Sequence, residues 1–211
     1  ETDILFSADQ QPVLYHDTLM TRISGVENAI HLLTLDELCQ YPANEPERLG
    51  QAFASEHITP LSALVGLLSE HPNVTAFIEL KRTGLETVDI KNAYRIVTEI
   101  LDPVIGQCVL ISFSDEFIQY AHEQQFPRLG VVLKDWQDRQ GPWITDIQPE
   151  FIFCDTDKVP EGATLDELQS TVVVYEVEDP DQAIDWFNRG ADMVETFDIG
   201  SMITNLAHRA L

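Results

Sequence analysis

Short apolar runs with the composition of β-strands alternate with amphipathic helical patterns along most of this chain, and that alternation constrains its fold more than any other feature. Such βα repeats are typical of a parallel sheet whose strands are joined by helices. We expect seven strands, at 1–4, 74–80, 107–113, 129–133, 151–154, 171–177 and 192–196. Helices are expected at 61–70, 86–101, 114–125, 165–170, 180–189 and 200–210.

Two helix starts carry local signals. Thr34 and Glu37 have the spacing of a capping box, and Thr59-Pro60 predicts a cap residue before a first-turn proline.

The strand pattern favours an α/β fold, a TIM (β/α)8 barrel short of one βα unit, since such barrels typically need about 250 residues. The long connection 17–58 is expected to form a small excursion over the barrel mouth, because long ordered loops are usually functional.

Length and charge narrow the class of protein. The 211 residues are 44% hydrophobic and contain no Pro/Gly/Ser-rich linker, which predicts one domain over 1–211. The formal charge of −24, from 36 acidic and 12 basic residues, disfavours a nucleic-acid partner. Most of these charges are expected to be solvated helix faces, and a salty habitat is another reason for such acidity.

Cysteine content and hydropathy point to an ordinary globular chain. Cys39, Cys108 and Cys154 are odd in number and far apart, so neither a disulfide framework nor a CxxC metal site is expected. Cys108 and Cys154 lie in apolar runs, which predicts buried, inert thiols. No run reaches the roughly 18 apolar residues of a membrane span. A cytoplasmic location is the weak expectation for an acidic, cysteine-poor chain, with secretion or a periplasmic location left open.

Acidic residues at strand ends suggest a metal site. Glu1 and Asp3 fall on one face of a predicted strand, as do Glu79 and Lys81 on another. Carboxylates without nearby cysteine or paired histidine favour Mg²⁺ or Ca²⁺, which prefer oxygen ligands. Glu1, Asp3 and Glu79 are therefore candidate ligands of a divalent cation, although a lone Glu-x-Asp is more often a solvated surface pair.

His16-Asp17 is followed later in the chain by Glu79-Leu80-Lys81. In that order and at that separation, these motifs carry most of a resemblance to the glycerophosphodiester phosphodiesterase family, which extends over nearly the full length of the chain. Supporting segments in the family's order are Glu1-Thr2-Asp3-Ile4, Ala8-Asp9-Gln10-Gln11-Pro12-Val13-Leu14-Tyr15, Thr21-Arg22-Ile23-Ser24-Gly25, Thr34-Leu35-Asp36-Glu37-Leu38, Ile58-Thr59-Pro60-Leu61 and Ile111-Ser112-Phe113.

The resemblance implies roles for five more residues. His16 would be catalytic, since a histidine can take or give a proton near neutral pH. Asp17 would either orient His16 or cap the following loop. Lys81 would place a positive charge on the phosphate, or would form an internal ion pair with the carboxylates. Phe113 would line the glycerol or leaving group or pack in the core, and Tyr175 would form an aromatic platform.

The resemblance also implies missing and altered parts. The family carries a His-Arg pair at the end of its first strand, and this sequence begins where the family's second strand ends. We therefore expect an incomplete record of a longer protein, lacking roughly 35 to 40 residues, about one βαβ step. Tyr175-Glu176-Val177-Glu178 replaces the family's usual Trp-Thr-Val-Asn, and Thr196-Phe197 its usual Thr-Asp, so the leaving alcohol stays open.

The activity implied is metal-dependent hydrolysis of a small glycerophosphodiester to glycerol 3-phosphate and an alcohol, in lipid and glycerol metabolism. In the family the glycerol hydroxyl is thought to attack first, giving a cyclic phosphate that water opens. The alternative is a non-catalytic barrel that binds a phosphodiester or metal as a regulatory module. Phospholipase D-like lipid cleavage ranks lower, because no extended apolar docking segment is present. The native metal and the oligomeric state are open.

Overall fold

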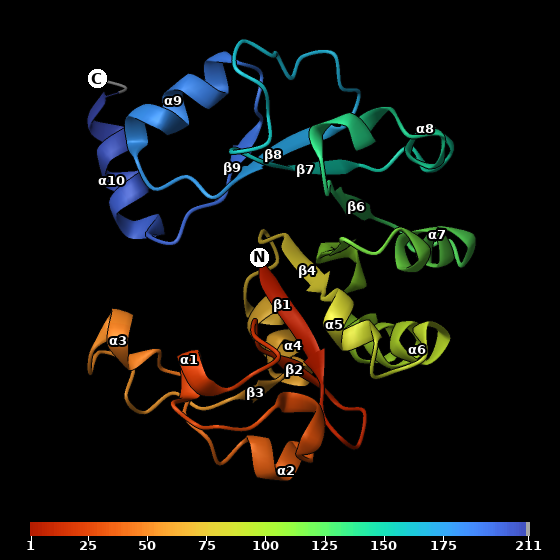
Figure 1. Ribbon diagram of the computed structural model, residues 1–211, viewed down its shortest axis with the longest axis vertical. Helices are drawn as coiled ribbons and strands as arrows, with labels where there is room; N and C mark the ends of the chain where they lie inside the picture. Colours follow the sequence, from red (N-terminus) through yellow and green to blue (C-terminus); the bar gives the residue numbers. More distant parts are fainter. Residues whose placement is uncertain (210–211) are drawn as a thin grey trace. The chain divides into compact units, whose positions relative to one another are not determined.

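The computed structural model describes residues 1–209, which fall into two compact units. The first unit runs from Glu1 to Arg128, coloured red to green in Figure 1, and the second begins at Leu129 and continues to blue. Both units are α/β, with parallel strands alternating with helices. The expectation of one domain over the whole chain stays a prediction.

Five strands form the sheet of the first unit, in the order β3-β2-β1-β4-β5. β1, β4 and β5 are parallel, whereas β2 and β3 run antiparallel to their neighbours. The strands are β1 (Thr2–Phe6), β2 (Pro12–Leu14), β3 (Thr59–Pro60), β4 (Ala76–Leu80) and β5 (Cys108–Ser112). The predicted strands at 1–4, 74–80 and 107–113 are thus confirmed, with small shifts at their ends.

The short strands β2 and β3 escaped prediction because three and two residues are too few to show a period. A tight turn reverses the chain after β1: the Ser7 amide donates to the Gln11 carbonyl (3.0 Å), and Gln10 has a left-handed φ of 59°. β2 then lies back along β1, with Leu14 opposite Ile4. This reversal returns the chain to the end of β1 where Asp3 lies.

The segment 17–58 builds a small cluster of its own. It holds α1 (Thr21–Ser24), α2 (Leu35–Leu38), α3 (Pro46–Leu49) and a 3₁₀ turn at Ile30–Leu32. Its buried side chains pack with those of β1 and β2; the cluster comprises Leu5, Val13, Tyr15, Met20, Ile30, Leu38 and Ile58. The predicted capping box of α2 is confirmed, since Thr34 and Glu37 bond to each other's backbone amides. The expected position of segment 17–58 over a barrel mouth stays a prediction.

The longer helices of this unit are α4 (Leu61–Glu70), α6 (Ile90–Leu101) and α7 (Asp115–Glu123), which largely match the expected ranges. The expected helix 86–101 starts later, because Asp89 caps α6 and Glu86 ends the separate turn α5 (Arg82–Leu85). The predicted cap at Thr59 is wrong. Thr59 lies in β3, where it pairs with Leu14 of β2, and the Thr59 hydroxyl donates to the His57 carbonyl. Pro60 is the N-cap residue of α4.

The second unit has four parallel strands in the order β6-β7-β8-β9. They are β6 (Leu129–Val132), β7 (Phe151–Asp155), β8 (Thr171–Tyr175) and β9 (Met193–Val194). The helices are α8 (Pro142–Ile147), α9 (Pro180–Asn188) and α10 (Ile199–Arg209), and α9 contacts both β9 and α10. All four strands and the helices near 180–189 and 200–210 were expected; Ala210 lies outside the described residues.

The expected helix at 165–170 is wrong, because this segment consists of turns. The Leu165 side chain is buried, and its amide donates to the Arg189 carbonyl at 2.7 Å. The Arg189 guanidinium in turn donates to the Pro160 and Ala163 carbonyls, which holds the preceding loop. A six-residue helix makes few internal hydrogen bonds, and in this segment the long-range contacts take their place.

All three cysteines are free, and Cys108 and Cys154 are buried as predicted. Burial raises the pKa of the Cys108 thiol to about 11 and that of Cys154 to about 12. Both side chains are therefore neutral, poorly nucleophilic thiols at ordinary pH. Within residues 1–209, no helix combines the length and the apolar character needed to cross a lipid bilayer.

Candidate active site

Glu79 is the one charged residue among the buried residues that the structure describes, with 6% of its surface exposed. It lies in β4, whose five residues are all buried. Burying a carboxylate is costly unless a cation or hydrogen-bond donors compensate it. Glu79 therefore marks the place in the first unit where a compensating positive charge is needed.

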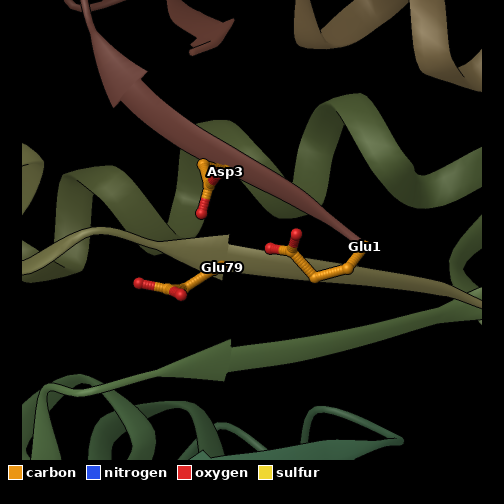
Figure 2. Close-up of side chains that lie close together, drawn as sticks. All are labelled: Glu1, Asp3 and Glu79. Atoms are coloured by element: carbon orange, nitrogen blue, oxygen red, sulfur yellow. The ribbon is translucent and has the colours of Figure 1, made fainter. Parts of the chain in front are cut away.

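Two further carboxylates reach Glu79 from the neighbouring strand. The parallel register of β1 and β4 sets Asp3 directly opposite Glu79, and Glu1 lies just before β1, on the same face as Asp3. One oxygen from each of Glu1, Asp3 and Glu79 lies within 4.8 Å of the other two. Figure 2 shows the three side chains converging on one space. The structure thus brings together all three predicted metal ligands.

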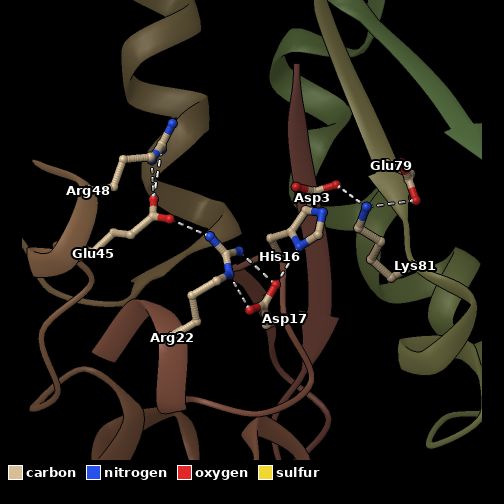
Figure 3. Close-up of polar contacts among 8 residues, drawn as sticks. All are labelled: Asp3, His16, Asp17, Arg22, Glu45, Arg48, Glu79 and Lys81. Atoms are coloured by element: carbon tan, nitrogen blue, oxygen red, sulfur yellow. Dashed lines mark hydrogen bonds and ion pairs between the residues drawn. The ribbon is translucent and has the colours of Figure 1, made fainter. Parts of the chain in front are cut away.

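Lys81 also reaches this cluster. Its Nζ lies 2.8 Å from Asp3 Oδ1 and 3.2 Å from Glu79 Oε1, as Figure 3 shows. Lys81 follows the last residue of β4 in an extended conformation, so its side chain stays on the face of Glu79. Burial lowers the pKa of Lys81, but Glu79 and Asp3 together outweigh burial and leave that pKa raised. Lys81 is therefore a cation held between two carboxylates.

The oxygens around Lys81 suit a divalent cation. Burial raises the pKa of Glu79, although the Lys81 charge opposes this shift. Glu79 Oε1 is buried and accepts no well-aligned hydrogen bond from the described residues, although Lys81 Nζ lies 3.2 Å away as an ion-pair partner. A buried acceptor of this kind beside two other carboxylates fits Mg²⁺ or Ca²⁺, which take oxygen ligands.

His16 reaches the same end of β1 through the returning chain. The Tyr15 amide donates to the Asp3 carbonyl at 3.0 Å, which ties the residue before His16 to the strand of the acidic cluster. A positive charge on His16 would favour the ionised form of Glu79. The His16 side chain is exposed, and its Nδ1 lies 2.6 Å from Asp17 Oδ1. Asp17 was expected either to orient His16 or to cap the following loop, and the structure shows its contact with His16.

Asp17 belongs to a chain of ion pairs that the sequence did not suggest. Arg22 donates from Nε to Asp17 Oδ2 (2.7 Å) and from Nη2 to Asp17 Oδ1 (2.8 Å), as drawn in Figure 3. Arg22 Nη1 also donates to Glu45 Oε1 (2.5 Å), and Glu45 Oε2 accepts from Arg48 Nε (2.8 Å). The hydrogen bonds from Arg22 are the main reason that the pKa of Asp17 falls to about 2.

The two predicted aromatic contacts lie in different units. Phe113 directly follows β5 in the first unit and is half-buried. Tyr175 ends β8 in the second unit and is also half-buried. The roles of both in substrate binding stay predictions.

Comparison with known proteins found similarity only to solved structures; no family model and no curated protein matches the chain. An Oleispira antarctica phosphodiesterase, solved in complex with the product sn-glycerol-3-phosphate, aligns with a TM-score of 0.80 and 20% identity over 98% of this chain and 83% of that chain. A glycerophosphodiester phosphodiesterase from Parabacteroides distasonis aligns with a TM-score of 0.72 and 18% identity over 100% and 84%.

A Thermotoga maritima glycerophosphodiester phosphodiesterase aligns with a TM-score of 0.66 and 15% identity, over 97% of this chain and 83% of that chain. The α/β fold of this chain is therefore the fold of glycerophosphodiester phosphodiesterases, as the sequence motifs predicted. This likeness confirms the predicted α/β fold class.

Proposed function

We propose that this protein is an enzyme that hydrolyses glycerophosphodiesters to glycerol 3-phosphate and an alcohol, with a divalent cation and with His16 as acid or base. The observation that carries the proposal is the convergence of Glu1, Asp3 and Glu79 with Lys81 on this fold. A similar fold was solved with sn-glycerol-3-phosphate in the Oleispira phosphodiesterase, which supports the class of substrate.

The residues of the cluster suit a phosphodiester, which is anionic and repels nucleophiles. Glu1, Asp3 and Glu79 would hold Mg²⁺ or Ca²⁺, and such an ion neutralises phosphate oxygens and the charge that develops on them. Lys81 would turn from its carboxylate partners to the phosphate, where its ammonium supplies a further positive charge. His16 would exchange a proton with the attacking or leaving oxygen.

Asp17 defines which nitrogen of His16 is available. With its pKa at about 2, Asp17 is ionised at neutral pH and can only accept a hydrogen bond. Nδ1 of His16 must then carry the proton in this contact, which leaves Nε2 to exchange a proton with the substrate. Phe113 would supply an apolar contact to the glycerol or the leaving group.

The test is release of glycerol 3-phosphate from glycerophosphocholine and glycerophosphoethanolamine by the purified protein with Mg²⁺, Ca²⁺ or EDTA. We expect metal-dependent turnover that His16→Ala abolishes, and His122→Ala, which changes a histidine of α7, serves as the matched control. Metal binding without turnover of either substrate would contradict the proposal and favour a non-catalytic binding module.

A further inference from the structure

We propose that Arg22 is a positioning residue: by binding both carboxylate oxygens of Asp17, it holds the His16 ring with Nδ1–H on Asp17 and Nε2 free to exchange a proton. This inference deepens the proposed function and rests on it. It concerns a residue that touches neither the acidic cluster nor His16 in the contacts described above.

The geometry of the Arg22–Asp17 pair carries the first step. Arg22 uses two different nitrogens on the two oxygens of Asp17, at 2.7 and 2.8 Å. This two-point contact fixes the rotation of the carboxylate as well as its position, whereas a single contact would leave rotation free. Asp17 Oδ1, which also accepts from His16 Nδ1 at 2.6 Å, is therefore fixed in direction.

Exposure of the histidine makes this restraint necessary. The His16 side chain is 55% exposed, so packing alone does not define the orientation of its ring. The Asp17 side chain is 24% exposed and the Tyr15 side chain before His16 is buried. The hydrogen bond from Nδ1 to a fixed carboxylate is then the contact that sets the ring and its tautomer.

Arg22 is itself held from the far side. Its third nitrogen, Nη1, donates to Glu45 Oε1 at 2.5 Å, and the Glu45 side chain is only 14% exposed. Arg48 binds the other oxygen of Glu45 and so lies one step farther from His16. The two arginine side chains are equally exposed, at 49% each. Arg48 is thus a matched control for loss of an exposed arginine bonded to Glu45.

The experiment combines histidine NMR with kinetics on Arg22→Ala, Arg22→Lys and Arg48→Ala. Ring-nitrogen spectra of ¹⁵N-histidine protein, with His16 assigned by His16→Ala, report which nitrogen of the neutral ring carries the proton. We expect Nδ1–H in the wild type and in Arg48→Ala, and a shift toward Nε2–H in Arg22→Ala. Turnover of glycerophosphocholine should show kcat lower by roughly 10- to 100-fold in Arg22→Ala, with KM little changed, as for loss of other groups that orient histidines.

Arg22→Lys separates geometry from charge, because lysine keeps the charge but presents a single point of contact. We expect it to resemble Arg22→Ala in tautomer and kcat. An unchanged tautomer in Arg22→Ala, equal losses in Arg48→Ala, or full rescue by lysine would each overturn the two-point positioning role. If the wild type shows no turnover, the proposed function fails, and the NMR result still decides whether Arg22 sets the His16 tautomer.

Discussion

Asp3 and Glu79 lie directly opposite each other on the adjacent parallel strands β1 and β4, and Lys81 Nζ lies close to both carboxylates. Two like charges placed side by side repel, and Glu79 is buried as well. A cation between them offsets both the repulsion and the cost of burial. Lys81 supplies one positive charge, and a divalent ion would supply two more.

Glu79→Gln should remove most of the affinity for Mg²⁺ or Ca²⁺. The change keeps the shape of the side chain but removes one of three anionic ligands, and ligand charge tunes Ca²⁺ affinity over several decades. We expect affinity to fall by roughly a hundredfold, measured by calorimetric titration with each ion. Glu99→Gln is the control, since Glu99 is exposed and paired with Arg95 on α6. Equal affinities in the two variants would exclude Glu79 as a ligand.

Lys81→Met should strengthen metal binding and weaken turnover. Methionine removes the ammonium that now shares Asp3 and Glu79, so a metal ion no longer competes with it. The substrate phosphate loses a charged contact of about 1.5–3 kcal/mol, so kcat/KM should fall about 10- to 100-fold. Titration with Ca²⁺ and kinetics at saturating metal separate the two effects. A fall in both affinity and turnover would mean that Lys81 mainly supports the structure of the site.

The metal-free Lys81→Met protein should also be less stable at neutral pH. Without Lys81 the buried Glu79 carboxylate keeps its desolvation cost and loses its nearest cation, an arrangement that costs several kcal/mol when fully buried. Urea unfolding with and without Ca²⁺ measures the free energy of unfolding. We expect the deficit to shrink with Ca²⁺, because a ligand that binds only the folded state stabilises it.

Asp17 should make stability depend on pH in a low, defined window. Its pKa in the folded protein, about 2, is below the ordinary value of 3.8, chiefly because of Arg22. The folded state therefore holds this proton less tightly than the unfolded state, so the contribution of Asp17 is present above about pH 4 and is lost as pH falls toward 2. Unfolding of the wild type and of Asp17→Asn, followed from pH 2 to 7, should converge at the acidic end. Asp36→Asn, at an exposed position in the same segment, should run parallel to the wild type.

Ser112 should prove structural. Its buried hydroxyl donates to the Leu80 carbonyl at 2.7 Å and accepts from the Ser114 amide at 3.0 Å, which joins the ends of β4 and β5. Ser112→Ala leaves both backbone groups without this partner and should cost about 1–3 kcal/mol in the free energy of unfolding. Thermal or urea unfolding measures the loss. Ser69→Ala, which removes an exposed hydroxyl on α4, should cost much less.

The order of the βα units and the chemical groups of the site could be predicted from local patterns in the chain. Apolar strand runs such as 107–113 and amphipathic helices such as 61–70 are periodic, and a period can be read locally. Prediction from these local patterns failed where the structure of a segment depends on residues distant in the chain. Two-residue β3 exists because Thr59 pairs with Leu14, and residues 165–170 form turns because Leu165 bonds to Arg189.

How these groups come together depends on contacts between distant parts of the chain. Glu79 reaches Glu1 and Asp3 through the parallel register of β4 with β1, and His16 returns to Asp3 through the reversal at β2. Arg22 binds Asp17, five residues before it, and Glu45, 23 residues after it. Neither the register nor the long-range ion pair leaves a period in the sequence. The register and the ion pair form only when strands pair and buried faces pack, because folding then brings each carboxylate or guanidinium next to residues that are distant in the chain.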